Sequence, residues 1–378
     1  MSQTARRSKV TAAVAVLLMV GVGCGGGGDD PELGTTSPGE GTVTASAPPG
    51  STTAPPPVPA PPPTIDPQPI TIAFAGDVHF EGRLEGRLDD PATAMGPMAA
   101  TLAAADLAIV NLETAVTTRG TPEPKEFTFR APPEAFTALV DAGIDVATMA
   151  NNHGLDYGPV SVPDALAAAS AAGLPVIGLG EDATQAFTPW IAGVKGQRVG
   201  FLAATAVMDT SLISSWSAGD GHAGVATALD GNNAALVAAV EALRPQVDTV
   251  VVDMHYGSDL QTCPTAIQQA VVEDVVNAGA DIVVGQHAHV VLGGGYHGSA
   301  YVHYGLGNFE FYVSTGSPTA GTGVLVLTVD GRAISAPQWI PGQIVDGLPT
   351  PLTGADAASA SQGWESLRPC AGLTDAPG

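Results

Sequence analysis

Residues 70–79 read Ile-Thr-Ile-Ala-Phe-Ala-Gly-Asp-Val-His, an apolar run that stops at a Gly-Asp pair. A short apolar segment that ends at turn-forming residues is typical of a buried β-strand. The same pattern recurs at 146–153 and at 250–255, where strand-like runs lead into Asn-Asn-His and into a single His. In each case, polar side chains able to bind a metal ion follow the predicted strand directly.

Helix-like stretches separate these strands. Alanine-rich segments cover 133–142, 162–172 and 264–278. Strands that alternate with helices predict an α/β fold, and ligands of such folds bind beyond the carboxyl ends of the strands. We therefore expect the polar residues at the strand ends to meet in one site.

The composition is strongly acidic. The 378 residues contain 13 Lys and Arg against 37 Asp and Glu, which gives a formal net charge of −24. Such a surface repels nucleic acid and anionic lipid headgroups, so neither is an expected direct partner. An anionic polymer would need locally bound cations. The simpler alternative is that the acidity only maintains solubility.

The N-terminus has the features of an export signal. Basic residues at positions 6, 7 and 9 precede an apolar run over 10–22, which ends just before Cys24. This arrangement resembles a bacterial lipoprotein signal, so residues 1–24 are predicted to be a signal peptide with lipidation at Cys24. The protein would then be extracytoplasmic and lipid-anchored to the cell membrane. Ordinary secretion and an uncleaved anchor are the alternatives.

Three further regions follow the signal. Residues 25–69 are rich in Pro, Gly, Ser and Thr and are predicted to be a disordered tether. Residues 70–346 form the predicted folded domain, and 347–378 form a C-terminal tail. Cys263 and Cys370 belong to no CxxC pair, so a thiolate zinc site is not expected. A disulfide between them could pin the tail, but the sequence leaves this pairing open.

The strand-end residues suit a site for two metal ions. An Asp-x-His offers a carboxylate and an imidazole, a His-x-His offers two imidazoles, and a glutamate can bridge two ions. Mixed oxygen and nitrogen ligands without thiolate favour Mn, Fe or Zn. Each residue alone could have an ordinary structural role, such as a helix cap or a turn residue. Such roles would have to hold at all eight positions together, which favours the metal site. The candidates are Asp77, His79, Glu113, Asn152, His153, His255, His287 and His289.

The motifs resemble one known family. Their order is that of the CapA-type capsule-biosynthesis proteins linked to poly-γ-glutamate, which look like a branch of the calcineurin-like metallophosphoesterases. The resemblance covers roughly 70–346 and implies a four-layer α/β/β/α sandwich. It rests on Gly76-Asp77, Asn111-Leu112-Glu113, Ala150-Asn151-Asn152-His153, His255-Tyr256-Gly257, Gly285-Gln286-His287-Ala288-His289 and Leu306-Gly307-Asn308-Phe309.

The resemblance also implies roles. Asp77, His79 and His289 would bind one divalent ion. Asn152, His255 and His287 would bind the second ion, Glu113 would bridge the two, and His153 would donate a proton to a leaving group. Glu113 stands where aspartate is usual in the wider superfamily, and many CapA-type proteins lack a histidine at the position of His79. Three residues near the motif loops could hold an anionic substrate: Arg83, Arg130 and Asn308.

Two functions from different classes follow. The first is a surface metal-dependent hydrolase, acting on a phosphoester in capsule or envelope polymer metabolism. The second is a non-hydrolytic assembly or export factor that grips the carboxylates of an anionic polymer and works with capsule-synthesis membrane proteins. An inert scaffold is a third reading. The remaining histidines, His222, His297 and His303, match no ligand motif and are expected to be structural or exposed.

Overall fold

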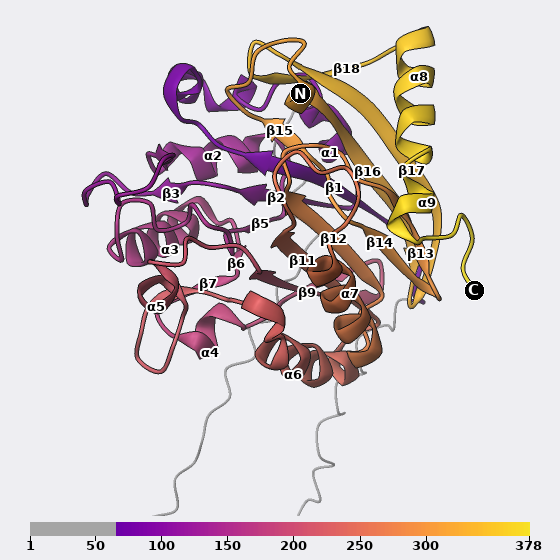
Figure 1. Ribbon diagram of the computed structural model, residues 1–378, viewed down its shortest axis with the longest axis horizontal. Coiled ribbons are helices and arrows are strands. Elements are labelled where there is room, and N and C mark those ends of the chain that lie inside the picture. The colour runs from indigo at the N-terminus through magenta and orange to yellow at the C-terminus, as the bar shows by residue number, and fades with distance from the viewer. Residues whose placement is uncertain (1–65) are drawn as a thin grey trace, which may run out of the picture. The chain divides into compact units, whose positions relative to one another are not determined.

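The computed structural model describes residues 66–378 (Figure 1). The predicted signal peptide, lipidation at Cys24 and residues 25–65 of the predicted tether lie outside the described residues. Regular structure begins at Ile70, the first residue of strand β1. Within 66–378, none of the helices combines the length and apolarity that a membrane crossing requires.

The first sheet has eight strands. Its centre is parallel, with β1 pairing to β2 and β2 to β5, while β16, β17 and β18 continue it as antiparallel strands. Strand β15 pairs with the end of β1 in parallel. In spatial order the strands are β18 (Leu348–Pro351), β17 (Ala333–Val345), β16 (Gly321–Asp330), β1 (Ile70–Val78), β2 (Leu107–Leu112), β5 (Val146–Thr148) and β6 (Val176–Ile177), with β15 (Asn308–Glu310) beside β1.

The second sheet has six strands. Four of them, β9, β11, β12 and β14, run parallel, and an antiparallel strand closes each side. Their order is β13 (Gly294–His297), β14 (Ala300–His303), β12 (Ile282–His287), β11 (Thr249–Tyr256), β9 (Gln197–Thr205) and β8 (Trp190–Val194). The parallel centre of both sheets explains why so many strand ends face the same way.

The two sheets pack face to face between two layers of helices. Helices α1 (Ala99–Ala104), α2 (Glu134–Asp141) and α3 (Ser161–Ala172) cover the alanine-rich face of the first sheet. The opposite face, which carries Ile72, Phe74 and Ile109, packs on the second sheet. Helices α6 (Ala234–Leu243) and α7 (Ala266–Ala278) cover the outer face of that sheet. The predicted four-layer α/β/β/α sandwich is therefore confirmed.

Short elements fill the connections between the layers. They are η2 (Gly82–Asp89), η3 (Pro91–Thr93), β3 (Ala115–Val116), β4 (Arg130–Ala131), β7 (Leu179–Gly180), α4 (Ala183–Ala186), α5 (Ile213–Trp216), β10 (Gly224–Val225), η4 (Leu229–Gly231), η5 (Arg244–Gln246) and η6 (Pro318–Ala320).

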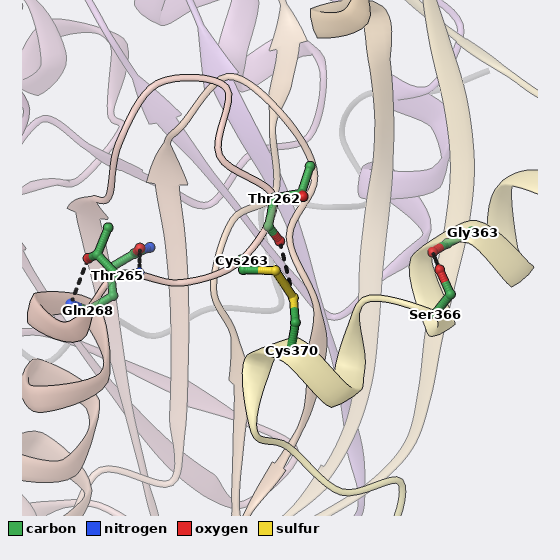
Figure 2. Close-up of a disulfide and its surroundings, with 7 residues drawn as sticks. All are labelled: Thr262, Cys263, Thr265, Gln268, Gly363, Ser366 and Cys370. Atoms are coloured by element: carbon green, nitrogen blue, oxygen red, sulfur yellow. Dashed lines mark hydrogen bonds between the residues drawn. A yellow bond between two sulfur atoms is a disulfide. The ribbon is translucent and has the colours of Figure 1, made fainter.

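The C-terminal segment is a regular part of the fold. Strand β18 extends the first sheet, and α8 (Gly354–Glu365) and α9 (Arg368–Ala371) follow it. The boundary predicted at residue 346 falls inside the β17–β18 hairpin. Figure 2 shows α9 joined to the loop before α7 by the Cys263–Cys370 disulfide. The indole of Trp364 also stacks on His303 and donates a hydrogen bond to its Nε2 at 3.0 Å.

Candidate metal centre

Strand ends from both sheets converge on one buried cluster. In the first sheet Asp77 pairs in register with Asn111 of β2 and with Asn308 of β15. The Nδ2 of Asn111 donates to Oδ1 of Asp77 at 2.8 Å and lies 3.2 Å from Nδ1 of His255 in the second sheet. The site therefore forms where the carboxyl ends of β1 and β2 meet the end of β11.

Glu113 has the least satisfied carboxylate of the cluster. Its side chain is fully buried, and neither oxygen has a hydrogen-bond partner. Its Oε1 lies 3.3 Å from Nε2 of His255, and Glu113, His287 and His289 each bring one ligand atom within 4.8 Å of the others. Burial raises the pKa of Glu113. A buried carboxylate without donors is costly, and a bound cation would remove that cost, so the donor set fits a metal ion.

Asp77 is held in a fixed orientation. Besides the contact with Asn111, its Oδ2 accepts the backbone N–H of His287 at 3.2 Å and lies 3.7 Å from Nδ1 of His289. Burial, together with the neighbouring charge of Glu113, raises the pKa of Asp77 to about 6. The carboxylates of Asp77 and Glu113 repel each other, so a positive charge bound between them would stabilise both.

His255 and Asn152 form the other side of the cluster. The Nε2 of His255 lies 2.8 Å from Oδ1 of Asn152. Burial lowers the pKa of His255 to about 4, so its imidazole is neutral at pH 7. Neutral imidazole is the form that binds metal ions.

The His-x-His turn has an unusual backbone. His287 and His289 both adopt positive φ values, 91° and 56°, which non-glycine residues rarely do. The Nδ1 of His287 is buried without a partner, and its Nε2 lies 3.3 Å from Asp259. The Nδ1 of His289 lies 2.8 Å from Oδ1 of Asn308. Burial works against charge on His289, but Glu113 and Asp77 raise its pKa above the usual value.

His153 pairs with an aspartate at the edge of the cluster. Its Nδ1 lies 2.6 Å from Oδ2 of Asp156, and its Nε2 faces Oε1 of Glu113 at 3.9 Å. Burial lowers the pKa of His153 to about 3 and raises that of Asp156 to about 7. A carboxylate on Nδ1 fixes the ring and leaves Nε2 facing the site.

His79 has backbone contacts at both ring nitrogens. Its Nδ1 is 2.9 Å from the backbone nitrogen of Glu81, and its Nε2 is 3.3 Å from that of Tyr312. The ring of Phe129 stacks on both His79 and His153, with centroid distances of 4.5 and 4.1 Å. To bind an ion, His79 would have to exchange one of its backbone contacts for the metal.

The predicted substrate-binding residues differ in their surroundings. Asn308 lies inside the cluster, beside His289. Arg83 instead donates to the backbone carbonyls of Tyr312, at 2.8 Å, and of Val313. The guanidinium of Arg130 lies 4.2 Å from the ring centroid of Tyr157. Both arginines therefore make contacts within the protein in this arrangement.

The histidines without a ligand motif have structural contacts. His303 is buried and packs against both Trp339 and Trp364, which also stack on each other. His297 pairs with Glu273 at 3.0 Å, and Nε2 of His222 lies 3.1 Å from the carbonyl of Ser215.

Four residues that support the site were not among the predicted site residues. Asn111 orients Asp77 and also accepts hydrogen bonds from Thr148 and Asn151. Asp253 lies behind it, where it accepts from Thr148 at 3.2 Å. Three of the four residues lie within three positions of a predicted ligand or proton donor, and this proximity in the sequence could have identified them: Asn111, Asp253 and Asp156. Lys125 lies in an irregular loop that carries no such signal.

Comparison with known proteins identifies relatives. A family model described as "Bacterial capsule synthesis protein PGA_cap" matches residues 71–312. The capsule biosynthesis protein CapA of Bacillus anthracis is 30% identical over 234 residues, which cover 61% of this chain and 55% of that protein. A probable polyglutamine synthesis accessory protein of Mycobacterium tuberculosis is 29% identical, covering 57% of this chain and 59% of that protein. The chain thus spans just over half the length of these two relatives.

Solved structures show more distant similarity. A hypothetical protein from Thermus thermophilus has a TM-score of 0.45 and 17% identity, covering 72% of this chain and 99% of that one. A putative 5'-nucleotidase from Staphylococcus aureus has a TM-score of 0.43 and 16% identity, and the match covers 80% of this chain and 59% of that one. A phosphatase from Mycoplasma pneumoniae has a TM-score of 0.44 and 14% identity, and the match covers 73% of this chain and 94% of that one. Each of these scores indicates only partial overlap of the two structures.

Proposed function

The chain belongs to the bacterial capsule synthesis family PGA_cap, and from this we propose that it is a surface protein of capsule or poly-γ-glutamate biosynthesis whose two-metal site hydrolyses a phosphoester. The observation that carries the proposal is the buried Glu113 carboxylate. Both of its oxygens lack partners, while His255, His287 and His289 surround it. A carboxyl buried in this way is either protonated or paired with a cation, and the three histidines around Glu113 favour the cation.

The proposed ligand sets are those that the family resemblance implies. Asp77 and His289 would hold one ion, with His79 as a further predicted ligand. Asn152, His255 and His287 would hold the other, and Glu113 lies near both groups. Oxygen and nitrogen ligands without thiolate favour Mn, Fe or Zn. Two such ions would supply positive charge to a phosphoryl group and lower the pKa of a water molecule.

The protein's own contribution to hydrolysis would come from the His153–Asp156 pair. Asp156 holds Nδ1 of His153, so Nε2 faces the carboxylate of Glu113 and the space beside it. With Asp156 protonated, as its raised pKa of about 7 allows, Nε2 would carry the ring hydrogen and pass it to the leaving oxygen of a bound phosphoester, while Nδ1 takes up the proton of Asp156. Asn308 contacts His289 through Oδ1 and donates from Nδ2 to the carbonyl of Thr319 at 3.2 Å, so to orient a substrate it would have to exchange one of these contacts.

A second candidate is a non-hydrolytic assembly or export factor. The relatives are named for capsule and polyglutamine synthesis, and a polyglutamate chain contains carboxylates and amide bonds but no phosphoester. Bound ions would then grip polymer carboxylates across a surface that otherwise repels them. Capsule-synthesis membrane proteins would be its partners.

One experiment tests the hydrolase and separates it from the alternative. The purified protein is first analysed for metal content and then assayed with that metal on a panel of phosphoesters. The His153→Ala variant should lose hydrolysis but keep its metals and its retention of polyglutamate. If no phosphoester is turned over and polymer retention persists in both proteins, the assembly function stands instead.

Localisation belongs to the same proposal. Lipidation at Cys24 would anchor the protein outside the cytoplasmic membrane. The Cys24→Ser variant should move from the membrane fraction to the medium. A variant that stays with the membrane would contradict lipid anchoring.

A further inference from the structure

Lys125 lies buried behind the turn that carries Asn152 and His153. Its side chain is only 6% exposed. Its ammonium donates to the backbone carbonyl of Asn152 and to Oδ1 of Asp156 at 2.9 Å, and it lies 3.5 Å from Oδ2 of Asp209. We infer that Lys125 is a positioning residue that locks this turn, and with it a metal ligand and the proton donor. The inference rests on the function proposed above.

The contacts of the ammonium argue against direct substrate binding. A lysine side chain has three N–H donors and no acceptor. Three oxygens surround Nζ here, one each from Asn152, Asp156 and Asp209, and the ring of Trp216 lies 5.1 Å away. Hydrogen bonds to Asn152 and Asp156 occupy two of the donors, and the carboxylate of Asp209 forms an ion pair with the same ammonium, so its charge is directed at oxygens of the protein. The role that remains is to hold its partners in place.

The turn is also held by the backbone of the same loop. The N–H of Glu123 donates to the carbonyl of Asp156 at 2.8 Å, and that of Phe129 donates to Oδ2 of the same residue at 2.6 Å. Gly120 approaches so closely that a Cβ there would lie 1.9 Å from the carbonyl oxygen of Tyr157. Residues 120–129 thus wrap around the turn, and Lys125 is the charged contact of this clamp.

Two links lead from Lys125 to the site. Through Oδ1 it orients the Asp156 carboxylate, whose Oδ2 lies 2.6 Å from Nδ1 of His153. Through the backbone it holds Asn152, whose Oδ1 lies 2.8 Å from Nε2 of His255. Loss of the ammonium would leave Asp156 without its cation and free the turn to shift. Supporting contacts of this kind commonly change metal affinity or activity by about 10- to 100-fold.

The test compares Lys125→Met with Lys195→Met in the full-length protein. Lys195 also pairs with an aspartate, Asp106, at 2.8 Å, but belongs to the turn between β8 and β9, away from the site. Metal-free protein is titrated with Mn²⁺ by calorimetry. We expect the weaker of two affinities to fall about tenfold or more in Lys125→Met and to stay unchanged in Lys195→Met. This readout requires no turnover, so it decides the role of Lys125 even if no phosphoester is hydrolysed.

The second readout addresses the proton donor. A p-nitrophenyl ester has a good leaving group that needs little protonation, whereas an alkyl phosphoester depends on it. Lys125→Met should therefore lower kcat for the alkyl ester about tenfold more than for the p-nitrophenyl ester. Wild-type Mn²⁺ affinity, or equal slowing of the two esters, would overturn the inference. If Lys125→Met does not fold, Lys125→Gln, which keeps a neutral donor, is read by the same criteria.

Discussion

The Nε2 atom of His255 lies 3.3 Å from Oε1 of Glu113, although the two residues come from different sheets. His255 belongs to β11 of the six-stranded sheet, and Glu113 follows β2 of the eight-stranded sheet. Both side chains are buried. Metal ions held by these residues would tie the two halves of the sandwich together, because a ligand that binds only the folded state stabilises it.

Glu113→Gln should separate stability from metal binding. In metal-free protein the neutral amide removes a buried carboxylate without partners, so the free energy of unfolding should rise by about 1–3 kcal/mol. Metal should stabilise this variant much less than the wild type. Urea unfolding with and without Mn²⁺ measures both effects, and Glu273→Gln, at an exposed acid, serves as control. A variant that is destabilised without metal would contradict this account of Glu113.

Asp253 should make the metal-free protein less stable as the pH rises. Burial raises its pKa from 3.8 to about 7. Its carboxyl is thus protonated in the folded protein up to about pH 7 but ionised in the unfolded chain above about pH 4. Between these two pH values the unfolded state binds fewer protons than the folded state. The contribution of Asp253 to stability is therefore present at low pH and is lost as the pH rises through 7. Between pH 5 and pH 7 the loss is about 2–3 kcal/mol.

Asp253→Asn isolates this contribution from those of the other buried groups. The side chain accepts from Thr148 and Gln286, and the unpartnered Oε1 of Gln286 can accept from the new amide after a flip. We expect the variant to gain stability relative to the wild type between pH 5 and pH 7, as measured by urea unfolding in EDTA. Parallel pH profiles for the two proteins would show that Asp253 does not titrate in this range.

The sequence predicted the fold and most of the cluster because both depend on strand ends. Apolar runs that stop at polar residues mark β1, β2, β5, β11 and β12, and parallel strands bring their ends together. The backbone contacts of His79 could not be predicted, since they depend on how the loop at Tyr312 folds back. Lys125 acts across 27 to 31 residues from an irregular loop, so no periodicity or spacing marks it. The predicted boundary at 346 falls at the turn of the β17–β18 hairpin, which an apolar pattern alone does not reveal, and the alanine-rich segment beyond it forms α8.

The Cys263–Cys370 disulfide should contribute strongly to stability. It closes a loop with a sequence separation of 107 residues, and cross-links of that length restrict the unfolded chain by about 4–5 kcal/mol in the chain-entropy model. The double variant Cys263→Ser, Cys370→Ser should lose stability of that order in urea unfolding. Cys24→Ser is the matched control and should leave it unchanged. Equal stability of all three proteins would mean that the tail is held by its packing alone.

Hydrogen exchange at the backbone amide of Tyr312 tests whether His79 binds a metal ion. If His79 becomes a metal ligand as predicted, its Nε2 gives up the contact with the N–H of Tyr312. Hydrogen exchange at that amide should then accelerate on metal loading, while most buried amides become better protected. Unchanged protection at Tyr312 would leave His79 as part of the aromatic wall formed with Phe129 and Phe311.

The number of metal ions per chain tests the central claim most directly. Elemental analysis of the protein purified without chelator, compared with Glu113→Gln prepared in parallel, gives this number. We predict close to two divalent ions per wild-type chain and at most one in the variant. A wild-type chain that binds no metal, or a variant that still holds two ions, would contradict the dinuclear site.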